Sequence, residues 1–557
     1  TGTLAGRFSA LSGNIDAGLD DLSWRKQYRV ASLRAKGRLD QGAAGPLELE
    51  TNVSGLVTPQ LRLERASVHA QGTRGQHALK CLAKNATVDI ESRFQGGWSD
   101  AAGWVGQLTE LTNRGRHAFV LKTPAQLAVD IARQRLLLGN ARIDLAGAKL
   151  DFHELAYDAG QTASRGEFSG LPLAYLQGAN AADADFKSDL VLGGDWQFAA
   201  RNSVNGHFAL WRERGDISLP TESPAALGLS SFAVNLDAVN NRLQGRMEAT
   251  GKHLGSLRAN AESLLSLRDG VWGIAGNAPL QGGADLSVES LVWLQPLLGG
   301  EASFNGDVKA RLQVAGVFAH PELTGALSGD RFTLALPEHG LSFREGRLEA
   351  ELAGQEVKLT SLVLHGGDGK LSGKGRLAFA DGAPSLQLAL QADKLEVFAR
   401  PDRHLILSGT SDVSLAGKAL QIAAKLKADR GLIELPKADA PTLGDDVVVL
   451  GRDTSAKKAR SPYGVGYELD LDLGDHFFIK GKGLDAQLGG ALKLAGTGNG
   501  LPTSRGSIRV VKGAYAAYGQ RLAIDRGLFN FQGPVDNPGL DIVALRKNQP
   551  VEAGVAV

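Results

Sequence analysis

The sequence predicts an all-β protein whose strands form one elongated sheet. Apolar and polar residues alternate with a period of two in run after run, as in Val308, Ala310, Leu312 and Val314. Each run ends at Gly, Pro or Asp within about 8 to 12 residues, which is the spacing of successive hairpins. Glycine supplies 71 of the 557 residues and aromatics only 6%, a composition typical of many turns between aliphatic strands. We expect on the order of 40 strands and a ladder about 150 to 200 Å long.

The first part of the chain, residues 1–300, is expected to form the N-terminal part of this sheet. Short alternating runs such as Leu47 and Leu49 fill residues 4–121. Trp98 and Trp104 lie in a glycine-rich segment, where two aromatic rings are expected to cover a rim or core of the sheet rather than to stack on a ligand.

Two short segments of this part have helical features. Residues 170–178 contain LPLAYLQ, with an early proline and mixed apolar spacing, and residues 286–298 have Ser287 as a possible N-cap. We interpret both as short helical inserts that pack over an end of the sheet or plug what the strands enclose.

The second part, residues 301–557, alternates more regularly. One segment, residues 451–464 (GRDTSAKKARSPYG), breaks the pattern with Lys457, Lys458 and Arg460. It is expected to be a solvated loop, with a lipid head-group contact as the alternative.

The stretch from Ser504 to Leu545 gives the most information about function. Its apolar residues are two apart, and it is expected to be a meander of short strands. Five glycines are expected to mark turns: Gly506, Gly513, Gly519, Gly527 and Gly533. Pro534, Asn537 and Pro538 form a further turn signal.

The order GSIRVVKGAYAAYGQRLAI, GLFNFQGP and DNPGLDI in this stretch resembles the C-terminal region of the TamB family, relatives of the AsmA-like proteins of Gram-negative cell envelopes. The resemblance continues more loosely over residues 306–379 and 407–449, where the elements keep the same order. Before Gly300 only the general character of the sequence is similar. It implies a curved β-taco or half-pipe with an apolar concave face and a few short helices. It also implies a periplasmic location, an N-terminal inner-membrane anchor and a few last strands, so that the chain is expected to be a fragment.

The net charge argues against nucleic acid as a partner, and the hydropathy argues against a segment that spans a membrane. Lys plus Arg number 61 and Asp plus Glu 60, so the net charge of +1 gives no field that would attract nucleic acid. No apolar run approaches the roughly 20 residues that cross a bilayer; the nearest is Leu291 to Leu298. The single Cys81 has no intramolecular disulfide partner.

No enzyme class is predicted, and neither a cofactor nor a metal is expected. The sequence lacks G-x-S-x-G, H-E-x-x-H, C-x-x-C and Walker A patterns. Residues 373–378 fit G-x-G-x-x-A but lie within strand alternation. His69 and His77 are the closest histidines and lack metal-ligand spacing. Asp445 and Asp446 precede an apolar strand start, as turn residues do.

An alternating strand must shield its apolar face with a second sheet, with helices or with a ligand that is not protein. Periodicity leaves this choice open. Few large rings are available to fill a sandwich, and the resemblance favours an open groove for phospholipid acyl chains. The residues expected to line the groove are Leu334, Leu336, Leu348, Leu352, Leu359, Leu377, Phe379, Leu415, Ile422, Leu469, Leu471, Ile508, Val510, Leu522, Ile524, Phe529, Phe531 and Ile542.

Three functions remain open from the sequence. The first is a periplasmic conduit that carries phospholipids between inner and outer membrane. The second is an assembly factor for outer-membrane or autotransporter proteins, acting with an insertase-type barrel such as TamA at the C-terminal end of the sheet. The third is a self-filled structural solenoid or sandwich, which would carry no lipid.

Overall fold

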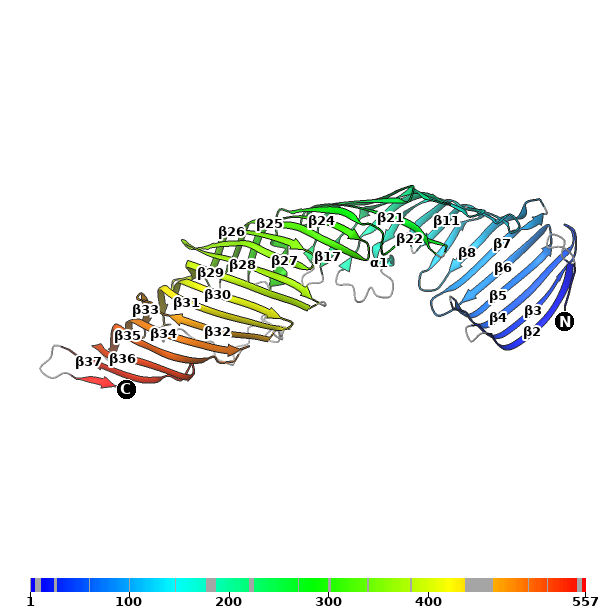
Figure 1. Ribbon diagram of the computed structural model, residues 1–557. Helices are drawn as coiled ribbons and strands as arrows, with labels where there is room; N and C mark the ends of the chain where they lie inside the picture. Colours follow the sequence, from blue (N-terminus) through cyan, green and yellow to red (C-terminus); the bar gives the residue numbers. More distant parts are fainter. Residues whose placement is uncertain are drawn as a thin grey trace. The chain divides into compact units, whose positions relative to one another are not determined.

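The computed structural model describes residues 2–5, 12–24, 28–59, 61–99, 101–145, 147–176, 187–219, 225–268, 270–298, 302–337, 340–380, 383–435, 464–498, 500–517, 519–547 and 553–557. Nearly all of these residues lie in strands, which are numbered to β38 along the chain (Figure 1). The predicted all-β class is therefore confirmed. The loop predicted at residues 451–464 and the pair Asp445 and Asp446 fall outside the described residues, apart from Gly464.

The chain divides into two compact units. Unit 1 comprises residues 1–220, 226–282 and 316–320, and unit 2 comprises residues 221–225, 283–315 and 321–557.

Unit 1 is a ladder of mostly antiparallel neighbours. Its elements are β1 (Gly2–Ala5), β2 (Ser12–Trp24), β3 (Tyr28–Leu39), β4 (Pro46–Val57), β5 (Arg62–Thr73), β6 (Gln76–Lys84), β7 (Asp89–Ser99), β8 (Gly103–Asn113), β9 (Phe119–Thr123), β10 (Ala125–Asp130), β11 (Arg135–Leu145), β12 (Ala148–Asp158), β13 (Gln161–Pro172), α1 (Leu173–Leu176), β14 (Lys187–Ser188), β15 (Val191–Ala200), β16 (Val204–Arg214), β17 (Ile217–Leu219), β18 (Ala225–Ala226), β19 (Leu229–Val239), β20 (Arg242–Gly251), β21 (Gly255–Arg268) and β22 (Val271–Ile274). β9 and β10 both pair with β8 and β11. β14, β17 and β18 form a separate small sheet.

Unit 2 continues the same architecture. Its elements are β23 (Gln281–Val288), the 3₁₀-helix η3 (Val292–Leu298), β24 (Ser303–Val317), β25 (His320–Leu336), β26 (Leu341–Ala353), β27 (Glu356–Gly366), β28 (Gly369–Ala380), β29 (Ala383–Arg400), β30 (Arg403–Ala416), β31 (Ala419–Glu434), β32 (Gly464–Asp472), β33 (Phe477–Gly481), β34 (Leu484–Thr497), β35 (Thr503–Ala517), β36 (Gln520–Pro534), β37 (Gly539–Leu545) and β38 (Gly554–Ala556). β31 pairs in parallel with β32 and β33, and both of these pair antiparallel with β34.

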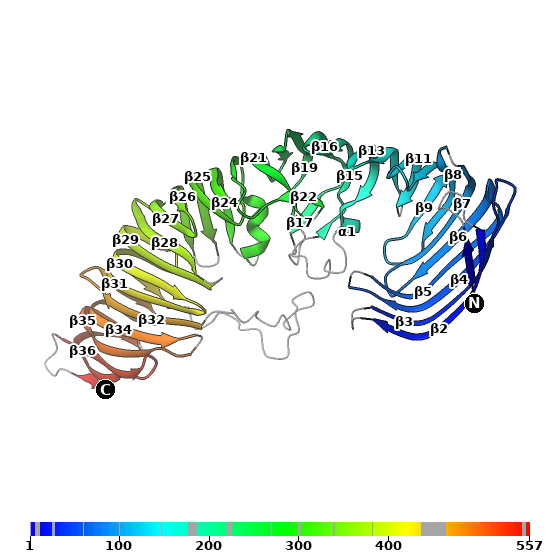
Figure 2. The same cartoon turned by 45° about the vertical axis from the view of Figure 1, so that its right-hand side comes forward.

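The strands are not flat. In unit 1, β2 to β6 bend visibly along their length (Figure 2). In unit 2, the pairing register shifts near Arg331, Glu345 and Lys394, each of which has a positive φ between 48° and 55°. Such bulges bend a strand and increase its twist. The sheet within each unit is therefore curved, as expected.

Both helical inserts exist, but the second begins later than predicted. α1 falls within the expected residues 170–178. Leu286 to Val288 still belong to β23, so Ser287 does not cap η3; this prediction is wrong. The cap is Ser290, whose Oγ accepts a hydrogen bond of 3.5 Å from the backbone N–H of Val292 and donates one of 3.0 Å to Asn305.

The two inserts pack on the sheets of their own units. Leu173 of α1 joins a cluster around Leu190 and Leu192, which are among the most buried side chains described. Leu294 of η3 packs in a cluster around Phe332. The chain itself therefore covers part of the sheet at these two places.

Four of the five glycines predicted to mark turns lie inside long strands instead. Gly506 and Gly513 belong to β35, and Gly527 and Gly533 to β36; each strand has 15 residues. Only Gly519, with φ of 72°, lies in the turn between them. The prediction of short strands is wrong here because a glycine within a sheet also makes room for a neighbouring side chain. A Cβ on Gly527 would stand 2.6 Å from Val510 Cγ2.

Candidate lipid-binding face

The strand registers of unit 2 place one side-chain row of each strand on a common face. Residues that face each other in a ladder point to the same side of the sheet. From β26 to β32 one such row consists of Leu352, Val357, Leu377, Leu386, Leu415, Leu420 and Val465. Further on, the row from β31 to β36 consists of Leu426, Leu471, Leu492, Gly506 and Phe531. We call this side the apolar face of unit 2.

The residues that the sequence predicts to line a groove all belong to strand positions of this face. Leu334 and Leu336 pair with Phe343 and Leu341 at one end. Ile508 and Phe529 pair at the other, and Phe529 pairs with Leu540, two residues from Ile542. Phe379 lies in β28 at a position of the same row, but its side chain is not among those described. Whether any of these residues contacts lipid stays a prediction.

Many side chains on the apolar face are half-buried, although some, such as Leu492 at 7% exposure, are buried. Among the predicted residues with described side chains, only Phe531 is buried, at 8% exposure. Within the described part of unit 2, extensive contacts join strands that are neighbours or near neighbours in the ladder, and no second sheet packs on this face. In a closed sandwich, opposing sheets interdigitate about 10 Å apart and bury such leucines. The apolar face thus keeps much of its aliphatic surface accessible.

The two rows traced above contain no charged residue. The charged pair on this side, Arg400 and Arg403, lies beside the turn between β29 and β30. Polar residues of the apolar face include Ser411 on β30, Tyr467 on β32 and Ser504 on β35. Ser504 is 1% exposed, and its Oγ donates a 3.1 Å hydrogen bond to the carbonyl oxygen of Gly533. An uncompensated charge on such a surface would attract water, so its absence from the two rows leaves the track uninterrupted there.

The sequence analysis missed strand β29 as a contributor to this face. Leu386, Leu388 and Leu390 pair with Leu377, Gly375 and Gly373 of β28. The signal was present in the sequence as SLQLALQ, an alternation like those in the strands that were predicted.

We call the side of unit 1 that carries the buried Leu108 and Ala125 the apolar face of unit 1. It contains more large rings than the low aromatic content of the chain suggests. Trp104 is 8% exposed and its Nε1–H donates a 2.9 Å hydrogen bond to His77 Nε2. The Nε1–H of Trp196 donates one of 3.0 Å to Ser164 Oγ. Phe94 packs edge-on against Trp104. The prediction that Trp104 covers a core of the sheet agrees with this burial.

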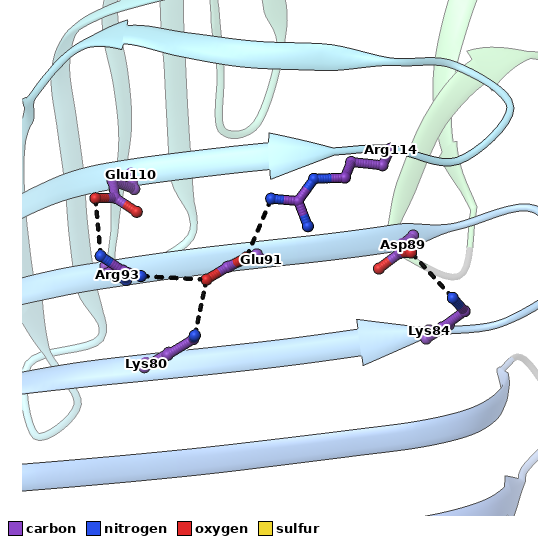
Figure 3. A network of polar contacts seen from close by, with 7 residues as sticks. All are labelled: Lys80, Lys84, Asp89, Glu91, Arg93, Glu110 and Arg114. Carbon is purple, nitrogen blue, oxygen red and sulfur yellow. Dashed lines mark hydrogen bonds and ion pairs between the residues drawn. The ribbon is translucent and has the colours of Figure 1, made fainter.

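The opposite, polar face carries cross-strand ion pairs. On β7, Glu91 accepts from Lys80 at 2.9 Å, from Arg114 at 3.4 Å and from Arg93 at 3.5 Å, and Arg93 also reaches Glu110 at 3.0 Å (Figure 3). The hydrogen bond from Lys80, against the opposing effect of burial, holds the pKa of Glu91 below its ordinary value. Charged side chains thus concentrate on the face away from the aliphatic rows.

A hollow of about 610 Å³ lies mainly on the polar face of unit 2, over β30 to β36. Charged side chains of both signs line it: Asp412, Lys425, Glu468, Asp470, Lys493 and Arg505. Its charged lining distinguishes it from the aliphatic rows, which lie on the other side of the sheet.

Membrane-spanning helices and metal-binding clusters are both absent from the described part of the chain. No helix there is both long and apolar enough to cross a membrane. No group of three or more His, Cys, Asp or Glu side chains stands close enough together there to hold a metal ion.

Comparison with known proteins gives two family matches and a relative. The model described as the TamB C-terminal domain matches residues 359–557, and the model described as the TamB N-terminal domain matches residues 1–329. The chain is also 25% identical over 365 residues to the "Translocation and assembly module subunit TamB" of Haemophilus influenzae (strain ATCC 51907 / DSM 11121 / KW20 / Rd). This match covers 59% of the chain and 26% of the relative, so the chain spans about a quarter of that protein's length.

Proposed function

The chain belongs to the TamB family, and from this premise we propose that it is part of a conduit that carries phospholipids along the apolar face of its sheet. Acyl chains would lie against the aliphatic rows while the head groups stay in solvent. The proposed setting is the periplasm of a Gram-negative bacterium, between inner and outer membrane, and the activity requires no catalytic residue.

The energetic need for such a surface is large. A two-tailed phospholipid in water exposes about 30 methylene groups, at about 0.8 kcal/mol each, so its transfer through water costs on the order of 25 kcal/mol. A continuous apolar track removes most of this barrier because the acyl chains move from one set of aliphatic side chains to the next without entering water.

The observation that carries the proposal is the pair of aliphatic rows on the apolar face of unit 2, which contain no charged residue. Rows of this face continue from β26 to β37 through successive cross-strand pairs. A self-filled sandwich, the third function open from the sequence, would need a second sheet on this face. Among the described residues, η3 packs on it near Phe332, but no second sheet does.

The test introduces a charge on the track. Leu359→Glu on β27 and Phe531→Glu on β36 should abolish transfer of a fluorescent phospholipid between vesicles and remove lipids that co-purify with the chain, as measured by mass spectrometry. A buried carboxylate without a partner costs several kcal/mol wherever an acyl chain excludes water.

The matched controls change the adjacent residue on the opposite face. Lys358→Glu and Gln532→Glu place the same carboxylate on the same strands, where both native side chains are exposed. They should transfer lipid like the wild type. All four variants should keep a β-type circular dichroism spectrum. Normal transfer by folded Leu359→Glu and Phe531→Glu proteins would refute the conduit.

The name of the Haemophilus relative, which describes a subunit of a translocation and assembly module, favours a second candidate function, that of an assembly factor. We propose outer-membrane proteins as what it would assemble. In that case the chain would offer a strand edge to a nascent protein or to an outer-membrane barrel. Charges on the apolar face should then leave assembly unaffected, so the same variants distinguish the two functions.

A further inference from the structure

We propose that the polar face of β35 docks the chain onto an anionic phospholipid surface. The basis is a row of three cations on this strand, Arg505, Arg509 and Lys512, which we call the β35 basic row. The row lies on the opposite side of the sheet from the apolar face, so this docking is a separate activity from acyl-chain binding.

The β35 basic row has no carboxylate in its own strand. β35 reads TSRGSIRVVKGAYAA and contains no Asp or Glu. All three cationic side chains are exposed, and none makes an ion pair or side-chain hydrogen bond with the described residues. Their charges are therefore available to a partner.

The strands on either side do not neutralise the row. Arg509 lies between Gly489 and Leu528, Arg505 lies between Lys493 and Gln532, and Lys512 faces Gln487. In the hollow beside Arg505, the nearer carboxylate, Asp470, is already paired with Lys493 at 3.3 Å. On β34, the exposed Asp485 lies diagonal to Lys512, and on β36 the exposed Asp525 is paired with Lys547 at 2.6 Å.

Three arginines on the polar face of unit 1 show what a facing carboxylate does. There, Arg93 faces Glu110, Arg135 faces Asp158 and Arg142 faces Asp151 across the ladder, each with an ion pair of 2.7 to 3.0 Å. The residues that face the β35 basic row across the ladder include no carboxylate of this kind.

An apolar side chain within the row points to a membrane rather than to an acidic protein surface. Val511 is 53% exposed and stands over Gly489, between Arg509 and Lys512. The combination of unpaired cations with an exposed aliphatic group suits the head-group region of a bilayer, where basic residues meet lipid phosphates and a small apolar group enters the interface.

The experiment is sedimentation of the 557-residue chain with vesicles of phosphatidylcholine alone or with phosphatidylglycerol added. The wild type should bind the anionic vesicles and release them as salt rises, since each cation near an anionic surface strengthens binding by about fivefold. The triple variant Arg505→Glu, Arg509→Glu, Lys512→Glu should bind at least roughly a hundredfold more weakly.

A matched control changes net charge by the same amount elsewhere. Lys36→Glu, Arg62→Glu and Arg65→Glu alter exposed cations on β3 and β5 of unit 1 and should leave vesicle binding within about twofold of the wild type. Folding of both variants is checked by circular dichroism.

Three results would overturn the proposal: equal binding to neutral vesicles, equal weakening in the control, or no binding by the wild type even if it captures immobilised polyglutamate. The last would point to an acidic protein as partner. Because binding is measured without lipid transfer, loss of docking and failure of the conduit are told apart.

Discussion

The apolar faces of the two units differ in the kind of side chain that forms them. In unit 1, the rings of Trp104 and Trp196 lie over glycines of neighbouring strands: a Cβ on Gly96 would stand 2.7 Å from Trp104, and one on Gly166 2.4 Å from Trp196. Each indole is also fixed by a hydrogen bond. In unit 2, rows of Leu, Val and Ile replace them, and two of its rings over glycine, Phe332 and Phe477, carry no polar atom.

The two rings seal the surface around them, although Ile15 on the same face of unit 1 is 45% exposed. A ring that fills the space above a glycine and is held by a hydrogen bond has one position, so it acts as part of the core. Half-buried aliphatic side chains keep rotamer freedom and present a uniform surface. Mutations of the two rings should therefore cost most stability, whereas charges on the aliphatic rows of unit 2 should mainly affect transfer.

The largest loss of stability is expected from Trp104→Ala. The substitution removes a buried ring and leaves His77 Nε2 without its donor, which should lower the free energy of unfolding by about 3 to 5 kcal/mol. Denaturant unfolding followed by circular dichroism measures it. A loss below about 1 kcal/mol would show that the ring is not part of a core.

Replacing a leucine by alanine should likewise cost more stability at Leu192 in unit 1 than at Leu469 in unit 2. Leu192→Ala in unit 1, where the side chain is 1% exposed, should cost about 2 to 5 kcal/mol. Leu469→Ala in unit 2, where the side chain is half-buried, should cost about 1 kcal/mol. Equal shifts of the unfolding midpoint would contradict the contrast and indicate that unit 2 is packed as tightly as unit 1.

A smaller effect is expected from Ser164→Ala. It leaves the Nε1–H of Trp196 without an acceptor while removing little volume, for a cost of about 1 to 2 kcal/mol. The double variant Ser164→Ala, Trp196→Phe removes both polar partners and should recover part of the loss. If the double variant is no better than the single one, the hydrogen bond does not fix the ring.

The smallest effect concerns the ion pairs of the polar face. Because the pKa of Glu91 is lowered in the folded state, its contribution is complete above the ordinary carboxylate pKa and is lost as pH falls through the lowered value. Glu91→Gln should therefore reduce stability at pH 7 by less than about 1 kcal/mol and have no effect at pH 2. Thermal unfolding at the two pH values tests this, and an equal effect at both would exclude the electrostatic origin.

Strand periodicity was sufficient to predict the fold class and the common face. The alternation of Leu469 and Leu471, for example, depends only on which residues precede and follow them. Features that depend on cross-strand neighbours were not predictable. Gly527 is needed because of Val510 on the adjacent strand, and Trp104 finds His77 two strands away through a register that no local pattern contains.

The helical inserts also show that features fixed by residues on other strands are not predictable from a local pattern. The sequence located α1 because an early proline marks it locally. It misplaced the start of η3 because Ser290 is fixed by Asn305, which lies on the next strand.

The antiparallel pairing of unit 2 also allows hairpins to be removed from the sheet. Between β26 and β29, each strand pairs with the next, so excision of the hairpin β27–β28 would bring Leu352 opposite Leu386 with chain direction and side-chain parity intact. The sheet would shorten by about 10 Å. The length of the sheet can therefore change by whole hairpins while the contact surfaces of the remaining strands stay as they are.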